Sequence, residues 1–399
     1  MLSLQWSAFG KEETPGDTND PLGLHAAERA IAAALVPGFS GATQRARSLA
    51  LLLGGVVLVE GAPEKERLDW FKHFDRLCVH RVAVEGPHQA THFSAGGIRA
   101  ALHQAAGRDG RALVDLTRQL GQASAGPTWV YQGLAQALGL LQPNRHPSAL
   151  GVATDLGRAL GRAALADLGL PLEEATRDLE RGSIRPVVLK RINIDRACRK
   201  AERTLIVGAL TNYRDAHGEQ PFPRLAQSDR GWGRLTARQQ VLRQLAEDLA
   251  DVVQRLENPF RLRAGGSRGP GDGPRSLRDN RKLHTQLAQV RGLLSTVGVE
   301  CSTHWIDGLL SVLDAGGHYD ALDAHHRRLM ASRGQPPWDA PRPLRGGVGA
   351  ADDAVLDEGA DSDGEQAADS NGAYTWEYCP SNLRLSALRR MVQDLGGLS

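Results

Sequence analysis

The sequence predicts a mainly α-helical protein, with a winged helix-turn-helix-like unit, an α-helical domain, a disordered loop and an acidic segment. Three observations lead to this fold class. Apolar residues recur at helical spacing along most of the chain. Clusters of Gly and Pro interrupt these stretches, and helices and turns alternate over residues 94–165. The chain has 399 residues, which is long enough for about two or three domains.

We expect the chain to divide into regions of different composition. They are an N-terminal helical region with the stretch PGFSGATQRAR at 1–93, a winged helix-like domain at 94–165, a basic α-helical domain at 171–345, a disordered acidic linker at 346–373, and a C-terminal strand and helix at 374–399. The linker is rich in Gly and Asp and almost free of bulky apolar residues, which is typical of disorder.

The N-terminal region is expected to consist mainly of helices. The first covers 22–36 and is stopped by Pro37 and Gly38, and others are expected at 43–52 and 68–77. A short strand is expected at 81–84. The apolar stretch 48–59 has about half the length that spans a bilayer, so we expect a buried helix and no membrane segment.

The winged-helix prediction rests on residues 94–165. Helices are expected at 98–106, 112–120 and 128–140, followed by a turn-rich wing and a closing helix. The presumed recognition helix, 128–140, has no Lys or Arg, and only its Gln132 and Gln136 offer hydrogen bonds to base edges. This unit therefore either contacts the DNA backbone through its wing or docks a protein. An unrelated helical bundle is the alternative fold.

Residues beyond 171 are also expected to be helical, with helices at 194–210, 236–256, 276–294, 305–313, 321–332 and 382–395 and a strand at 374–378. In the clearest helix, 236–256, Thr236 and Gln239 predict a capping box. Asn258 and Pro259 are expected to end it. Residues 261–275 contain AGGSRGPGDGP, which predicts a flexible basic loop.

The sequence contains no recognisable catalytic motif. It lacks GxxxxGK[ST], GxSxG and HExxH, and no GxGxxG follows an expected strand. Its four Cys form no CxxC pair, which argues against a zinc ribbon and fits a reducing cytosol. We therefore favour a cytoplasmic, non-enzymatic protein without a cofactor, a metal ion or a catalytic residue.

Histidines gather in two stretches that deserve testing as metal ligands. One stretch of twenty residues holds His73, Cys78, His80, His88 and His92, but this spacing matches no standard zinc site. The other holds His318, His325 and His326 beside Asp320 and Asp323. Neighbouring helical residues point about 100° apart, so His325 and His326 cannot easily share an ion. We expect partner contacts or plain surface positions there.

The net charge of +2 conceals an asymmetry. Residues 351–369 hold eight acidic and no basic residues, so the rest of the chain has 48 basic against 38 acidic residues. Most of this excess lies in 181–345, with 28 basic against 17 acidic residues. Such a surplus is typical of a nucleic-acid-binding surface, and a solvated Arg-rich surface is the alternative.

We expect DNA to be held through its phosphates with low sequence specificity, because the cations lie outside the presumed recognition helix. The candidate nucleic-acid-binding residues are Arg191, Arg199, Lys200 and Arg203, then Arg263, Arg268 and Arg278 in or just after the flexible loop, and Arg145 in the wing.

The segment VPGFSGATQRARSL, at 36–49, resembles a signature of an uncharacterised prokaryotic family. The matching residues are Pro37, Gly38, Ser40, Thr43, Gln44, Arg45, Ala46 and Arg47. Members of that family occur in phage-defence gene neighbourhoods beside helicases and nucleases. The resemblance therefore implies an accessory subunit of a bacterial multi-protein antiviral defence system that acts on DNA, with a helicase or nuclease as partner.

The charged part of this signature, Gln44, Arg45 and Arg47, is also a candidate partner-binding or structural motif. Arg45 and Arg47 would lie about 200° apart on a helix. One arginine could then pair with an internal carboxylate while the other contacts a ligand or a partner. The alternative is a structural ion pair that ties the helix to the next domain.

These observations favour a non-enzymatic, DNA-associated accessory subunit of a multi-protein bacterial anti-phage defence or DNA-processing complex. Two other functions stay open at this point. One is a divergent metal-dependent nuclease that uses carboxylates without a recognisable pattern. The other is a pure protein–protein adaptor.

Overall fold

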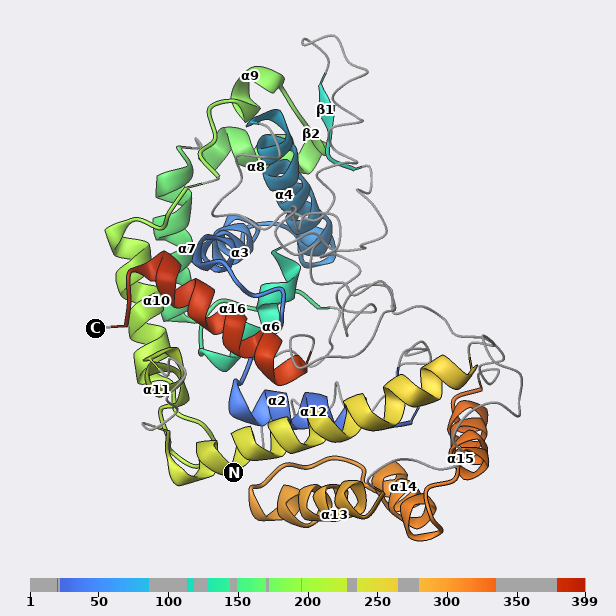
Figure 1. Cartoon of the computed structure of the whole chain (residues 1–399). Helices are drawn as coiled ribbons and strands as arrows, with labels where there is room; N and C mark the ends of the chain where they lie inside the picture. Colours follow the sequence, from blue (N-terminus) through green and yellow to red (C-terminus); the bar gives the residue numbers. More distant parts are fainter. Residues whose placement is uncertain are drawn as a thin grey trace. The chain divides into compact units, whose positions relative to one another are not determined.

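A computed structural model of the chain describes residues 20, 22–85, 113–117, 128–143, 149–169, 172–194, 196–227, 235–264, 280–334 and 379–398. Within these residues the chain is mainly α-helical, as predicted, and its β structure is short (Figure 1). The chain forms two compact units. The first contains residues 1–36, 230–351 and 366–383, and the second contains 37–229, 352–365 and 384–399.

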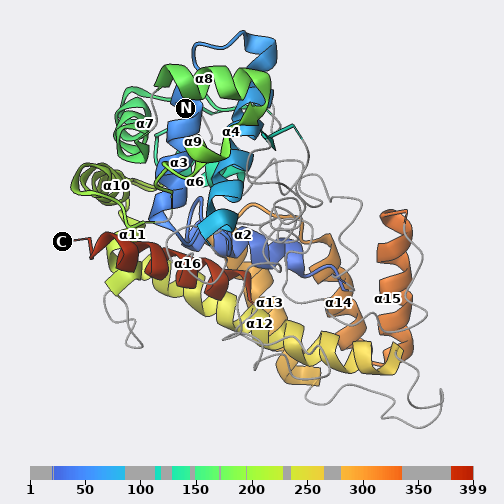
Figure 2. The same ribbon diagram turned by 90° about the horizontal axis from the view of Figure 1, so that it is seen from above.

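The first unit is built from helices. They are α2 (His25–Leu35), α12 (Ala237–Ala264), α13 (Asn280–Thr296), α14 (His304–Asp314) and α15 (Tyr319–Ser332). Both α2 and α13 pack on α12, while α14 packs on α13 and α15 on α14 (Figures 1 and 2). The buried face of α12 has helical spacing and consists of Leu242, Leu245, Leu249, Val252, Val253 and Leu256.

The start of α12 confirms the predicted capping box. The Gln239 backbone N–H donates to Thr236 Oγ1 at 3.2 Å, and the Thr236 N–H donates to Gln239 Oε1 at 3.1 Å. The predicted end at Pro259 is wrong, because the helix continues to Ala264. Tertiary packing explains the continuation: Phe260 is buried, and its ring lies 5.2 Å from the ring of His326 on α15.

The second unit contains the remaining elements. They are α3 (Ala46–Leu58), α4 (Glu64–Glu85), β1 (Val114–Asp115), η2 (Trp129–Tyr131), α6 (Gln132–Ala137), α7 (Asp155–Leu168), α8 (Leu172–Arg181), β2 (Ser183–Ile184), α9 (Pro186–Leu189), α10 (Lys200–Asn212), α11 (Pro221–Gln227) and α16 (Pro380–Leu395), of which the part from 384 onward belongs here. Strands β1 and β2 pair antiparallel, with Val114 opposite Ile184.

Helix α3 lies at the centre of this unit. Every residue from Ala46 to Val56 is buried, as the apolar sequence predicts. Helix α7 packs along α3, and α4 and α10 also contact it. Apolar side chains from α4, α7, α8 and α9 complete a shared core, which includes Leu51, Phe74, Leu77, Leu165, Leu168, Leu179, Ile184 and Leu189.

Several predicted elements in this unit are wrong. The expected strand at 81–84 belongs to α4, where Arg81 Nε donates to the Ile192 carbonyl oxygen at 2.6 Å and Val82 enters the core. The expected helix at 112–120 contains β1 instead, because β2 satisfies its backbone groups. The expected helix at 194–210 begins only at Lys200. The expected helix at 98–106 lies outside the described residues.

Close approach of α3 and α7 depends on small residues. Gly161 on α7 faces the α3 backbone, and a Cβ there would collide with the Leu53 carbonyl oxygen and lie 2.6 Å from Val57 Cγ2. A Cβ at Gly157, one turn earlier, would lie 3.1 Å from Leu53 Cδ1 on α3 and would collide with the Leu140 carbonyl oxygen. Thr154 begins the helix by accepting a hydrogen bond from the Gly157 N–H at 3.1 Å. The helices therefore approach closely along a glycine-lined seam.

We expect Gly161→Ala to lower the free energy of unfolding by about 1–3 kcal/mol, because the added methyl group overpacks the seam. Gly208→Ala in α10 is the matched control. A Cβ at Gly208 meets no atom within 4 Å, so this change should raise the free energy of unfolding by about 0.5–1 kcal/mol. Urea denaturation followed by circular dichroism measures both. An equal effect of the two changes would refute the close approach.

Candidate nucleic-acid interface

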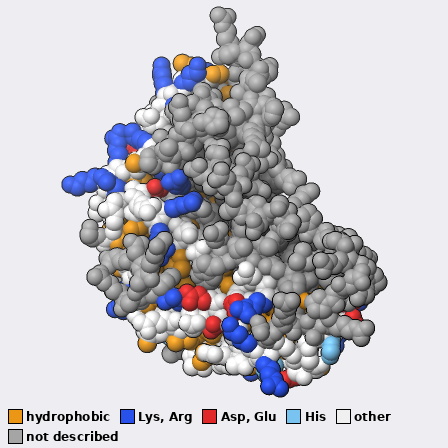
Figure 3. All heavy atoms as spheres, in the orientation of Figure 1, with side chains coloured by type: hydrophobic (Ala, Val, Ile, Leu, Met, Phe, Trp, Pro, Cys, Tyr) orange, Lys and Arg blue, Asp and Glu red, His pale blue; other side chains and the backbone are white. Residues whose placement is uncertain are grey.

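Exposed cations gather in the second unit between α8 and the first turn of α10. Residues 181–203 contain eight basic and two acidic residues. Its exposed basic members, which we call the basic surface, are Arg181, Arg185, Lys190, Arg191, Arg199, Lys200 and Arg203. Figure 3 shows Lys and Arg side chains over α9 and over the start of α10. Such a concentration of positive charge can bind phosphates.

The structure places four of the predicted DNA-binding residues on this surface. Arg191 follows α9, Arg199 is the N-cap of α10, and Lys200 and Arg203 lie in its first turn. On a helix the last three positions fall within an arc of about 100°, so they share one face. Arg263 belongs to α12 of the first unit, and its side chain is not described. Arg145, Arg268 and Arg278 lie outside the described residues.

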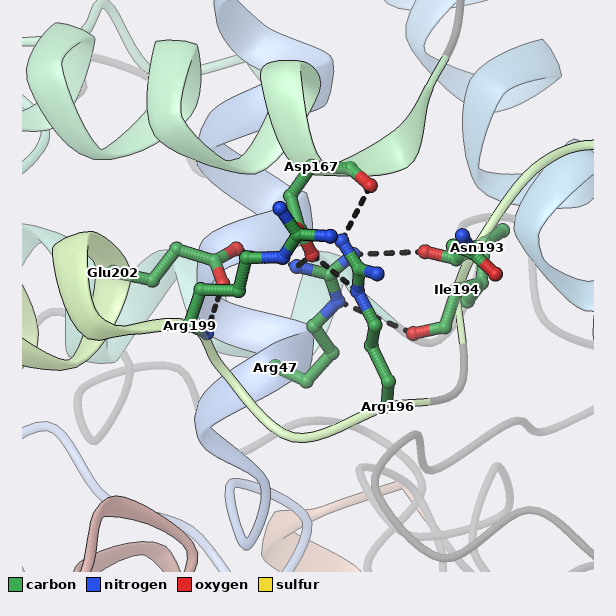
Figure 4. A network of polar contacts seen from close by, with 7 residues as sticks. All are labelled: Arg47, Asp167, Asn193, Ile194, Arg196, Arg199 and Glu202. Atoms are coloured by element: carbon green, nitrogen blue, oxygen red, sulfur yellow. Dashed lines mark hydrogen bonds and ion pairs between the residues drawn. The ribbon is translucent and has the colours of Figure 1, made fainter.

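A buried ionic network holds the start of α10 in place (Figure 4). Its centre is Arg47 near the start of α3, whose side chain is 1% exposed. Its guanidinium pairs with Glu202 on α10 and, at 3.2 Å, with Asp167 at the end of α7. It also donates to the carbonyl oxygens of Asn193 at 2.9 Å and Ile194 at 3.2 Å. One guanidinium thus joins α3, α7, α10 and the 193–194 segment.

Two arginines of the basic stretch pair with the same buried carboxylate. Arg196 and Arg199 both contact the carboxylate of Asp167, and Arg196 also donates to the Asp167 carbonyl oxygen at 2.6 Å. Glu202 accepts the Arg199 backbone N–H at 2.8 Å, which caps α10. Burial, together with the nearby charges of Arg199 and Arg47, lowers the pKa of Arg196. Lys200 and Arg203, in contrast, project from the surface.

The other residues of the Arg-rich motif bind α16. Arg45 Nη1 lies 3.2 Å from Asp394 Oδ1, and Gln44 Oε1 accepts a hydrogen bond from Arg390. The Arg45 backbone N–H donates to the Tyr131 hydroxyl at 2.9 Å, and burial raises the pKa of Tyr131 to about 12. Gln44 and Arg45 therefore contact a guanidinium, a carboxylate and a hydroxyl group within the chain.

Sequence reasoning did not identify the acidic partners of these arginines. Asp167, Glu202 and Asp394 carry no local signal, because the Arg47–Glu202 and Arg45–Asp394 pairs span 155 and 349 residues. The only signal in the sequence was Arg47 itself, which stands at the start of an apolar stretch that predicts a buried helix. An arginine inside such a helix must meet an internal carboxylate or carbonyl oxygen.

Several residues considered for other chemistry are internal instead. His325 and His326 are buried, so the prediction of partner contacts or surface positions is wrong for these two residues. Both rings pack inside the unit, His325 against Trp305 and His326 against Phe260. Gln132 Oε1 accepts the Gly151 N–H at 3.1 Å and is 7% exposed. Burial also raises the pKa of Cys198 to about 12, which keeps its thiol protonated.

Comparisons of the chain with protein-family models, with curated proteins and with solved structures give no match. Within the described part of the chain, no helix is both long and apolar enough to cross a membrane.

We expect Arg47→Met to lower the free energy of unfolding by about 3–5 kcal/mol, because the buried carboxylates of Asp167 and Glu202 would lose a compensating positive charge. Arg45→Met removes the ion pair with Asp394, in which the arginine side chain is 30% exposed. It should lower the free energy of unfolding by about 1 kcal/mol or less. Chemical denaturation of both variants and the wild type measures the difference. Equal losses would show that the Arg47 network has no special role.

Proposed function

We propose that this protein is a non-enzymatic, DNA-associated accessory subunit that holds nucleic acid through its phosphates. The observation that carries the proposal is the basic surface, where exposed cations greatly outnumber carboxylates. Each Lys or Arg that neutralises a phosphate releases counterions, which favours binding at low salt.

The buried network supports this function by preorganising the surface. Asp167 and Glu202 are buried, and their carboxylates pair with Arg47, Arg196 and Arg199. They therefore neutralise these three guanidinium groups and leave Lys200 and Arg203 exposed at the start of α10. Cations held on a rigid helix lose less conformational freedom on binding than cations on a loose loop.

Low sequence specificity is part of the proposal. The proposal also includes the winged-helix unit. In it, α6 would be the recognition helix and α7 the closing helix. The β-bridge between Leu141 and Ala153 would form the base of the wing. Because α6 has no cation and Gln132 is engaged with Gly151, this helix offers little for reading bases. Phosphate contacts from α9 and α10 would then dominate the affinity.

We also propose that the protein works in the bacterial cytoplasm beside a helicase or nuclease, in an anti-phage defence or DNA-processing complex. The support is the resemblance of the segment 36–49 to the family signature. Because Gln44 and Arg45 are engaged with α16, a partner would bind elsewhere on the chain.

The test is fluorescence anisotropy of a labelled random-sequence DNA duplex with the full chain over a range of salt concentrations. The triple variant Arg191→Glu, Lys200→Glu, Arg203→Glu should bind at least about tenfold more weakly, with a shallower salt dependence on every sequence alike. The control triple, Arg224→Glu, Arg281→Glu, Arg328→Glu, changes the net charge equally at other exposed positions and should retain most of the affinity.

Other outcomes would contradict particular parts of the proposal. Equal weakening by both triple variants would mean that overall charge, and not this surface, drives binding. Absence of binding by the wild-type protein at low salt would favour the adaptor function. Cleavage of plasmid DNA in the presence of Mg²⁺ or Mn²⁺, abolished by single Asp or Glu substitutions, would favour the nuclease function instead.

A further inference from the structure

A cluster of buried carboxylate and imidazole groups lies in the first unit, whereas the basic surface belongs to the second. One ligand atom from each of Asp20, His25 and Glu257 lies within 4.8 Å of the other two. His25 is the first residue of α2, Glu257 lies on α12, and Asp20 precedes α2 in the chain. All three side chains are 0–1% exposed. Three segments of the unit thus converge on one point.

A further carboxylate lies beside His25 in the next turn of α2, outside the group of three atoms that lie within 4.8 Å of one another. Glu28 lies three residues after His25 on the same helical face, and it is 2% exposed. His25 Nε2 lies 3.3 Å from Glu257 Oε1 and 3.7 Å from Glu28 Oε2. Both separations lie within the range of ion pairs. Donors around a tetrahedral ion with bonds of about 2.1 Å lie about 3.4 Å apart, which these separations resemble.

Asp20 is held in position by groups outside the cluster. Its Oδ1 accepts the N–H groups of Gly23 at 2.8 Å and Leu24 at 3.0 Å, and its Oδ2 lies 3.1 Å from Arg333 Nη2. A carboxylate has about four acceptor positions, so three donors leave room for one further ligand contact. Arg333 thereby fixes the orientation of the Asp20 carboxylate, as residues hydrogen-bonded to a metal ligand commonly do.

We propose that Asp20, His25 and Glu257 form a closed structural site for a divalent transition-metal ion, in which Glu28 moves in as the fourth ligand when the ion binds, and that Zn²⁺ binds more tightly than Mn²⁺. One imidazole nitrogen and three carboxylate oxygens suit these ions, whereas Mg²⁺ and Ca²⁺ prefer oxygen donors alone. The order of Zn²⁺ over Mn²⁺ follows the general affinity series for divalent metals.

The carboxylates of this cluster need a positive charge beside them. Asp20, Glu28 and Glu257 contribute three negative charges, while Arg333 and Arg29 place positive charge near Asp20. A cation at His25, either a proton on the imidazole or a metal ion in its place, compensates the remaining charge. Buried charges are stable only when they are compensated.

The burial of the donors argues for a structural ion. A catalytic zinc keeps a position open to water or substrate, while a structural zinc is enclosed by protein ligands. Here the donors are 0–2% exposed. The ion would tie the segment before α2, α2 itself and α12 together, and it would stabilise the folded state by mass action.

The experiment uses the full, tag-free chain after treatment with a chelator. Isothermal titration with Zn²⁺ should give one tight site per chain, with elemental analysis after dialysis confirming the stoichiometry. Titration with Co²⁺ should produce the intense visible absorption of a tetrahedral complex. Zn²⁺ should raise the melting temperature, and Mg²⁺ at the same concentration should not.

Two conservative ligand variants and a matched control make the assignment specific. Glu257→Gln and Glu28→Gln keep the side-chain volume and should each weaken Zn²⁺ binding by at least about 100-fold. The control is His284→Gln, which removes a half-buried imidazole 3.0 Å from Asp314 in the same unit. It should leave the tight site unchanged, and circular dichroism confirms that each variant is folded.

The proposal is overturned if the wild-type chain binds no Zn²⁺ more tightly than the ligand variants do. It is also overturned if wild-type Co²⁺ spectra lack tetrahedral absorption, a result that does not depend on any variant folding. Either result would assign the cluster to a protonated His25 paired with Glu28 and Glu257. Because no DNA is present in these measurements, their outcome is independent of the function proposed above.

Discussion

Burial of the Arg47 guanidinium is the constraint on which the second unit depends. A guanidinium group cannot lose its charge, so one that is 1% exposed needs carboxylates and carbonyl oxygens around it. Asp167, Glu202 and the 193–194 backbone supply them from three separate parts of the chain. The end of α7 and the start of α10 must therefore meet the start of α3 at one point.

The proposed interface follows from the same constraint. Five charged groups share the network, and its two carboxylates are turned inward toward Arg47, Arg196 and Arg199. What remains outside is positive: Lys200 and Arg203 continue the face of α10, and Arg191 follows α9. An Arg-rich stretch can thus serve two purposes, because its inner members stabilise the fold while its outer members stay available for phosphates.

The two units use buried charge differently. In the second unit, three guanidinium groups surround two carboxylates, so the excess is positive and part of it reaches solvent. In the first unit, three carboxylates lie around one imidazole, and Arg333 pairs with one of them, Asp20, so carboxylates outnumber guanidinium groups in an enclosed cluster. An enclosed negative excess attracts a cation, and an exposed positive excess attracts an anionic polymer. The two proposed ligands therefore differ for an electrostatic reason.

The sequence by itself determined the helical class, most helices and the capping box at Thr236, because these depend on contacts within a few residues. It also located the cations of α10. Tertiary structure alone decided the extension of α12 past Pro259, the helical state of 81–84, and the partners of Arg47 and His25. Those outcomes depend on packing and on charges that are distant in the chain, and local propensity carries no information about either.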